Sequence, residues 1–112
     1  MRYRKNVETL PGKPDIVFGR SRVVVFCDGD FWHGRNWKEL ESRLRKGTNA
    51  EYWVSKIHSN IERDRLNNSL LEADGWSVLR LWETDIKRDP QAAAKMVRDT
   101  VIERYDVNHP RG

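Results

Sequence analysis

The fold is decided by residues 15–34, which read Asp-Ile-Val-Phe-Gly-Arg-Ser-Arg-Val-Val-Val-Phe-Cys-Asp-Gly-Asp-Phe-Trp-His-Gly. The segments 15–18 and 22–27 are rich in β-branched and other apolar residues, which predicts two strands. Gly19 begins the short turn between them. Because so short a connection joins neighbouring strands, we expect an antiparallel hairpin.

Patterns on both sides of this hairpin predict further strands and helices. In chain order we expect a short leading strand within 3–9, a turn at 10–14, the hairpin, a short helix over 38–45, a long helix over 50–73, a strand over 76–82 and a last helix from Pro90 to about Tyr105. A strand that rejoins the sheet after a long helix requires a crossover, so the fold class is α/β, with a small mixed β-sheet flanked by helices. The chain has no repeat, linker or low-complexity segment, which predicts one domain over residues 1–112.

The composition narrows the classes of protein to which the chain can belong. It has 21 Lys and Arg against 17 Asp and Glu, with a formal charge of +4, which fits a polyanionic partner such as nucleic acid. The single cysteine, Cys27, excludes an internal disulfide and a four-cysteine zinc site. No apolar run approaches the roughly 20 residues of a membrane span. The N-terminus also lacks the apolar core of a signal peptide, so we expect a soluble, cytoplasmic protein.

Two carboxylates flank the predicted hairpin, since Asp15 opens its first strand and Asp28 closes its second. With a two-residue turn, Asp15 lies opposite Phe26, and Asp28 is a diagonal neighbour within roughly 7–8 Å. A slip of one residue in the register would separate them. Such carboxylates can hold a divalent cation. The alternative is that Asp15 and the Asp28-Gly29-Asp30 segment are ordinary turn residues.

An aromatic pair and a histidine follow the second strand. His33 can accept a proton from water, or it is an ordinary solvated histidine. Phe31 and Trp32 lie in a glycine-flanked loop, where adjacent aromatics are suited to wedge between base pairs. The alternative is that they bury their rings in the core. Together with the carboxylates, this block indicates metal-dependent attack on nucleic acid.

The long predicted helix carries a carboxylate on its apolar face. Trp53, Ile57 and Ile61 share one face, and Asp64 continues it by a step of three. Asp64 either pairs with a nearby arginine or orients His33 or a water bound to metal. The arginines on either side of it, Arg63 and Arg65, are candidates for contacts with phosphates.

Taken together, these residues resemble the very short patch repair endonucleases, the Vsr family. The matching blocks are Leu-Pro-Gly-Lys-Pro-Asp-Ile-Val-Phe (10–18), Val-Val-Val-Phe-Cys-Asp-Gly-Asp-Phe-Trp-His-Gly (23–34), Tyr-Trp-Val-Ser-Lys-Ile-His-Ser-Asn-Ile-Glu-Arg-Asp-Arg (52–65) and Gly-Trp-Ser-Val-Leu-Arg-Leu-Trp-Glu (75–83). Four blocks in the family's order are far more specific than any one of them. The resemblance implies a fold like that of the PD-(D/E)XK nucleases of restriction endonucleases.

The resemblance also implies a catalytic role for individual positions. Asp15 matches the family's metal-binding aspartate, and the main-chain carbonyl of Cys27 matches a second metal contact. His33 matches the histidine that activates water, and Asp64 the aspartate that supports it. Asp28 is either a turn residue or a residue that contacts the catalytic groups without itself touching the metal or the substrate. The implied cofactor is Mg²⁺, with Mn²⁺ as an alternative, bound as one ion or two at the scissile phosphate.

The implied partner is double-stranded DNA. Phe31 and Trp32 match the aromatics that insert next to the mismatched pair. The resemblance therefore implies a Mg²⁺-dependent endonuclease that nicks DNA at or near T·G mismatches.

The chain departs from the family's pattern in two places. Members of the family hold a structural zinc, but the corresponding positions here are Asp30, Arg35, Trp37 and Thr84, so we expect no structural zinc. Asp30 then remains a turn residue or a supporting group, and other packing must fix the loop over 29–37. The family also has a helical segment before its Tyr-Arg strand, where this sequence begins. We therefore expect a homodimer or a second chain to supply that helix.

Two other functions stay open from the sequence. One is a PD-(D/E)XK-type nuclease of a restriction or mobile-element system without mismatch specificity. The other is a DNA-binding remnant that is inactive without the missing N-terminal helix.

Overall fold

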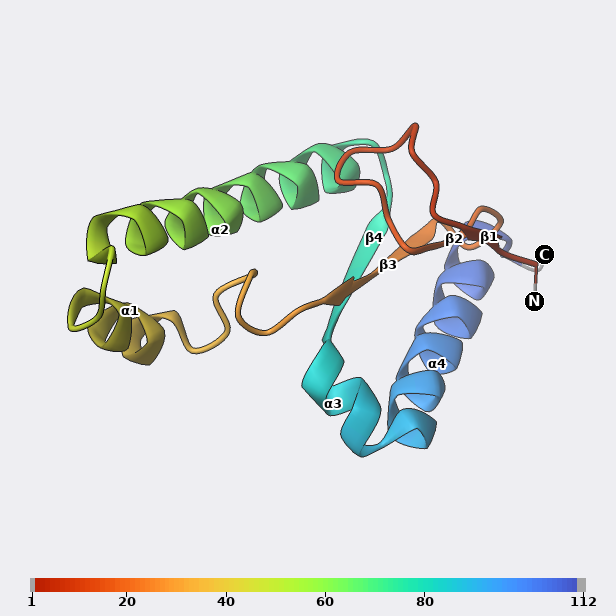
Figure 1. The fold of residues 1–112 in the computed structure, drawn as a ribbon. Coiled ribbons are helices and arrows are strands. Elements are labelled where there is room, and N and C mark those ends of the chain that lie inside the picture. The colour runs from red at the N-terminus through yellow and green to blue at the C-terminus, as the bar shows by residue number, and fades with distance from the viewer. Residues whose placement is uncertain (1, 111–112) are drawn as a thin grey trace.

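A computed structural model describes residues 2–110, in which one mixed sheet is flanked by helices (Figure 1). The strands lie in the order β1 (Arg4–Lys5), β2 (Ile16–Phe18), β3 (Val23–Asp28) and β4 (Ser77–Trp82). The described residues also form helices α1 (Trp37–Arg45), α2 (Ala50–Ala73), α3 (Glu83–Arg88) and α4 (Pro90–Asn108). The pairs β1–β2 and β2–β3 are antiparallel, whereas β3 and β4 are parallel. The predicted α/β class and the mixed sheet are confirmed.

The hairpin of β2 and β3 has the register that a two-residue turn requires, which the sequence had left open. Ile16 pairs with Val25 and Phe18 with Val23, so the next pair along the ladder brings Asp15 opposite Phe26. This register keeps Asp15 and Asp28 on one face at the same end of the hairpin. The carboxylates of Asp15 and Asp28 therefore lie at the same end of the sheet, just before the start of β2 and at the end of β3.

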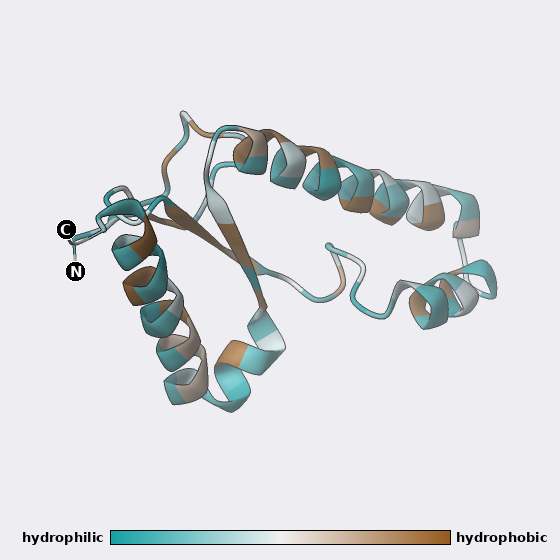
Figure 2. Cartoon of the chain, turned by 180° about the vertical axis from the view of Figure 1, so that it is seen from behind, coloured by the Kyte–Doolittle hydropathy of each residue, from teal (hydrophilic) through white to brown (hydrophobic). Residues whose placement is uncertain are grey.

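Strand β3 is buried on both faces, which explains its almost continuous apolar sequence. Its alternate side chains join two hydrophobic clusters. The first contains Val7, Val17, Val24, Phe26, Leu71 and Trp76, and so includes a residue of α2. The second contains Phe18, Val23, Val25 and Val101, and so includes a residue of α4. The two long helices therefore cover opposite faces of the sheet. The central strands β2 and β3 between them are strongly hydrophobic (Figure 2).

Helix α2 extends well past the sheet toward α1 (Figure 1). The loop between β3 and α1 lies beside the middle of α2. Asn60 of α2 holds this loop by donating a hydrogen bond from Nδ2 to the carbonyl of Trp32 at 2.9 Å. This arrangement brings residues just after β3 against residues in the centre of α2. No helix in residues 2–110 is both long and apolar enough to cross a membrane.

The structure differs from the sequence predictions at three elements. The leading strand is shorter than the range 3–9, because Asn6 takes a left-handed conformation with φ of 50° and ends it. Helix α3 was not predicted; its first turn is acidic, and the side chain of Asp30 accepts a hydrogen bond from the amide of Thr84 there. Helix α4 runs to Asn108 rather than to about Tyr105.

Candidate active site

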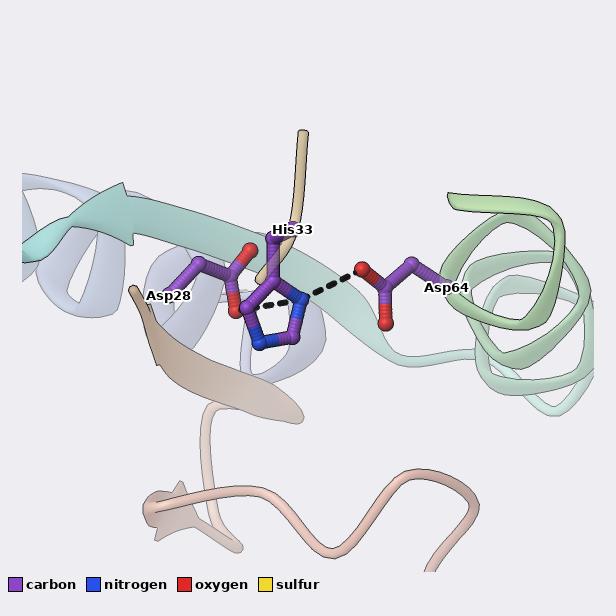
Figure 3. Close-up of side chains that lie close together, drawn as sticks. All are labelled: Asp28, His33 and Asp64. Carbon is purple, nitrogen blue, oxygen red and sulfur yellow. Dashed lines mark hydrogen bonds and ion pairs between the residues drawn. The ribbon is translucent and has the colours of Figure 1, made fainter. Parts of the chain in front are cut away.

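His33 and Asp64 form a hydrogen-bonded pair at the end of the sheet. The Nδ1 atom of His33 lies 2.6 Å from Oδ2 of Asp64 on α2, and 3.8 Å from Oδ1 of Asp28 at the end of β3. The other ring nitrogen lies on the side of the ring turned away from Asp64 (Figure 3). A histidine whose Nδ1–H is held by a carboxylate presents Nε2 as an acceptor, which is the arrangement that a general base requires.

Asp28 is buried against the guanidinium of Arg80, a residue that the sequence analysis did not select. Arg80 donates from Nη1 to both oxygens of Asp28, at 3.0 and 3.1 Å, and the same nitrogen lies 3.7 Å from Asp64. Burial raises the pKa of Asp28, while Arg80 and His33 act in the opposite direction. The sequence signal that could have found Arg80 is its charge in the middle of the mainly apolar strand β4. In the sheet, Arg80 is the parallel partner of Phe26 in β3.

Asp15 lies outside this cluster and faces the backbone of β3. Its Oδ2 atom accepts a hydrogen bond from the amide of Cys27 at 2.7 Å. Burial raises the pKa of the Cys27 thiol, as do the negative charges of Asp15, Asp28 and Glu83. The structure therefore places Asp15 next to Cys27, as a shared site requires, but does not join it directly to His33 or Asp64.

The His33–Asp64 pair and Asp28 together offer three ligand atoms that lie close enough to one another to hold a cation. Asp28, His33 and Asp64 each offer one such atom, and these lie within 4.8 Å of one another. However, Arg80 already brings a positive charge against Asp28 and near Asp64, which disfavours a second cation at the same point. Asp15 forms no ion pair with any residue in 2–110.

The aromatic pair is exposed and belongs to a larger cluster. Phe31 and Trp32 are 39% and 50% exposed, so they are not core residues. Both rings contact Trp53 of α2, with centroids 5.7 and 5.9 Å apart, and Tyr52 packs edge-on against Trp53 at 5.1 Å. Trp53 lies on the apolar helix face that the sequence predicts, but its contacts with the loop aromatics and with Tyr52 depend on the fold and have no signal in the sequence.

The loop that carries these residues is fixed by ion pairs and close packing. Arg35 donates from Nη1 to Asp30 at 3.1 Å and to Asp85 of α3 at 3.0 Å. Asp30 also accepts from the amide of Thr84. Three of the four positions that correspond to zinc ligands thus belong to one polar network. At the next turn, Gly34 has φ of 69°, and a Cβ there would lie 2.5 Å from Ile61, so only glycine fits.

The two arginines beside Asp64 differ in their surroundings. Arg63 lines a hollow with His33, Asp64 and Arg80. Arg65 lies on another side of α2, where it donates to Glu62 at 3.2 Å. The structure therefore brings Arg63, but not Arg65, next to the His33–Asp64 pair.

Comparison with known proteins assigns the family. The family described as DNA mismatch endonuclease Vsr matches residues 1–39. The type II nicking enzyme V.NmeDIP of Neisseria meningitidis serogroup C is 41% identical over 108 residues, which cover 96% of this chain and 72% of that enzyme. The chain belongs to the Vsr family of DNA endonucleases. The type II nicking enzyme V.HpaIIP of Haemophilus parainfluenzae is 35% identical, with 93% of this chain and 72% of that enzyme covered.

Family membership confirms the resemblance seen in the sequence. The DNA mismatch endonuclease Vsr of Escherichia coli is also similar, at 34% identity over 93% of this chain and 62% of that protein. A nuclease family points to a divalent cation, and this Vsr chain has an acidic and histidine cluster at the end of its sheet.

Proposed function

We propose that the chain is a single-domain, Mg²⁺-dependent endonuclease that nicks DNA at or near T·G mismatches. The observation that carries this proposal is the His33–Asp64 pair, joined by a 2.6 Å hydrogen bond at the end of the sheet and close to Asp28 (Figure 3). We assign catalytic roles to Asp15, His33 and Asp64. DNA-contacting roles are proposed for Phe31, Trp32, Arg63 and Arg65.

His33 acts as the general base in this proposal. Its Nε2 atom takes a proton from the attacking water, while Asp64 keeps the proton on Nδ1 and stabilises the imidazolium that forms. The same hydrogen bond fixes the direction of the ring. Asp28 and Arg80 support the pair as one nearly neutral unit beside it.

The cation site that we propose is Asp15 with the main-chain carbonyl of Cys27. The fit rests on the second oxygen of Asp15, which forms no hydrogen bond within residues 2–110, whereas Asp28 and Asp64 are engaged by Arg80 and His33. Carboxylate and carbonyl oxygens suit Mg²⁺, and Mn²⁺ accepts the same ligands. A bound cation would polarise the phosphate and offset the charge that develops on its oxygens.

The aromatic cluster is the part of the site that we propose to select the mismatch. Phe31 and Trp32 project from a loop that Asn60, Arg35 and Asp30 hold in place, so little ordering is needed before they enter a duplex. Mispaired steps are less costly to unstack than paired ones, so a fixed wedge favours them.

Nicking of a T·G duplex and of its T·A counterpart tests this function. Wild type with Mg²⁺ is expected to nick one strand of the T·G duplex and to leave the T·A duplex largely intact. Asp15→Ala is expected to abolish nicking while the far-ultraviolet circular dichroism stays unchanged. A folded wild type that nicks neither duplex in Mg²⁺ or Mn²⁺ would refute the proposed activity.

A second candidate function is a nuclease of a restriction system without mismatch choice. It is favoured by the name of two relatives, which are called type II nicking enzymes. Equal nicking of the T·G and T·A duplexes would support it. A DNA-binding remnant without turnover is the third candidate, and it predicts binding of both duplexes without any product.

The participation of a homodimer or a second chain stays a prediction. Measuring the mass of the protein on the T·G duplex by analytical ultracentrifugation tests it. Two copies per duplex would support the homodimer, and one active copy would exclude it.

A further inference from the structure

A hollow of about 460 Å³ opens beside the His33–Asp64 pair. Its walls come from the turn over residues 10–14, from β3 and β4, and from α2. The side chains that line it include those of Lys13, Phe26, Arg63, Asn67 and Arg80. Three cationic side chains line the hollow, those of Lys13, Arg63 and Arg80, against one carboxylate, that of Asp64.

Lys13 is held at the hollow by a tightly packed turn. A Cβ on Gly12 would lie 3.0 Å from Nδ2 of Asn67 and 3.1 Å from the ring of Phe26, so the turn rests directly on α2 and β3. Asn67 and Arg63 are one helical turn apart on the same side of α2. Lys13 therefore faces the hollow next to Arg63.

The backbone at Lys13 is one that glycine would adopt more easily. Its φ is 53°, in the left-handed region that a side chain makes unfavourable. A lysine at such a position carries a conformational cost, which a functional side chain can justify.

The charges around the hollow are unequally satisfied. Arg80 is tied to Asp28, and Asp64 is tied to His33. Within the part of the chain that the structure describes, Lys13 and Arg63 form no ion pair. Two exposed cations without an internal partner thus face the same space beside the dyad, and an anion of the substrate would complete them.

We propose that Lys13 and Arg63 form a phosphate-binding subsite. The phosphodiester that it holds is the neighbour of the scissile phosphodiester on the same DNA strand. This inference rests on the proposed function. The guanidinium can bind two phosphate oxygens at once, and the lysine adds a point charge in the same hollow. Holding the neighbouring phosphate fixes the strand, so that the scissile phosphate meets Nε2 of His33.

Binding measured without metal tests the subsite separately from cleavage. Fluorescence anisotropy of a labelled T·G duplex in EDTA is recorded from low to moderate salt for wild type, Lys13→Gly and Arg63→Gln. Each variant is expected to bind about tenfold more weakly and to lower the slope of log affinity against log salt by about 1, since one phosphate contact is lost. Lys13→Gly is expected to keep the melting temperature of wild type, because glycine accepts the φ at this position.

Matched controls lie on α4, on the opposite face of the sheet. Lys95→Gln and Arg98→Gln remove the same charge from exposed positions there and are expected to change neither the affinity nor the salt slope. If Lys13→Gly and Arg63→Gln behave like these controls, the subsite does not exist, whatever the protein does with Mg²⁺. The same binding loss in all four variants would mean a general effect of net charge and would also overturn the inference.

Neutralising single phosphates locates the contact. A duplex series with one methylphosphonate at each position around the nick is titrated with wild type and Arg63→Gln. A methylphosphonate at one position next to the scissile phosphate is expected to weaken binding by wild type. The same methylphosphonate is expected to cause no further loss of binding in Arg63→Gln. Full additivity at every position would refute the assignment. Failed nicking with these binding results intact would count against the proposed function alone.

Discussion

At the scale of single residues, Arg80 links strand β4 of the sheet to the His33–Asp64 pair. Its guanidinium contacts Asp28 and stacks over Phe26 at 3.9 Å, while Nε donates to Asn68. Arg80→Met would leave a buried carboxylate without its partner, so we expect a loss of about 3 kcal/mol in the free energy of unfolding at pH 7. Urea unfolding measures this. The double variant Asp28→Asn with Arg80→Met is expected to lose less than the sum of the single changes.

The pH dependence of that variant follows from Asp28. Burial already raises the pKa of Asp28, and removal of Arg80 raises it further. A carboxyl whose folded pKa is raised gives most stability below its unfolded pKa of about 4 and loses it as pH rises through the folded value. The gap between Arg80→Met and wild type should therefore narrow in acid. A gap that is constant from pH 4 to pH 8 would contradict this account.

Trp32 is the residue that tests whether the aromatic cluster reads DNA. It is half exposed, so Trp32→Ala should keep the fold and weaken binding of the T·G duplex by about 1–3 kcal/mol if the ring stacks on a base. Anisotropy titrations measure the change, with Tyr105→Ala on α4 as an exposed aromatic control. Unchanged affinity in Trp32→Ala would make the ring a purely structural element of the loop.

At the scale of elements, the loop between β3 and α1 depends on Arg35 and its two carboxylates. Arg35→Ala should speed hydrogen exchange of the amides of His33 and Arg35, which bond to the carbonyls of Gly29 and Asp30. Arg45→Ala, which breaks only an exposed pair with Glu41, is the control. Exchange in the loop that is equal for both variants would show that Arg35 does not hold it.

The same loop should respond to acid but not to chelators. Hydrogen bonds from Thr84 and Arg35 lower the pKa of Asp30, even though desolvation opposes them. The interaction therefore stabilises the loop above the ordinary pKa of an aspartate, and it is lost as pH falls through the lowered value. Trp fluorescence should report loosening only in strong acid, and EDTA should leave the melting temperature unchanged. A marked drop with EDTA would indicate a structural metal.

Elements with a strong local pattern were predicted, and those that depend on distant contacts were not. The antiparallel hairpin followed from its short turn and α2 from its apolar spacing, whereas the register of the hairpin stayed open until the structure showed it. Helix α3 has no apolar stripe, and the amide of Thr84 in its first turn is held by Asp30, 54 positions away. Arg80 was missed for the same reason, since its partner Asp28 lies 52 positions away in the sequence.

At the scale of the whole molecule, the sheet brings together residues from four separate segments. The turn over 10–14 and the residue that follows it supply Lys13 and Asp15, β3 supplies Asp28, the loop supplies His33, and α2 supplies Asp64. The sequence suggested each carboxylate and the histidine, and the family resemblance implied their roles. The fold adds that Asp15 sits apart from the His33–Asp64 pair.

The central claim is that Asp15 and the His33–Asp64 pair serve one reaction from two sides. Single-turnover nicking of the T·G duplex by wild type, Asp15→Ala, His33→Ala and the double variant tests it most directly. If the groups act as a unit, each single variant falls by at least about 10²-fold and the double variant falls little further. An Asp15→Ala rate near that of wild type would contradict the account, as would single losses that simply multiply in the double variant.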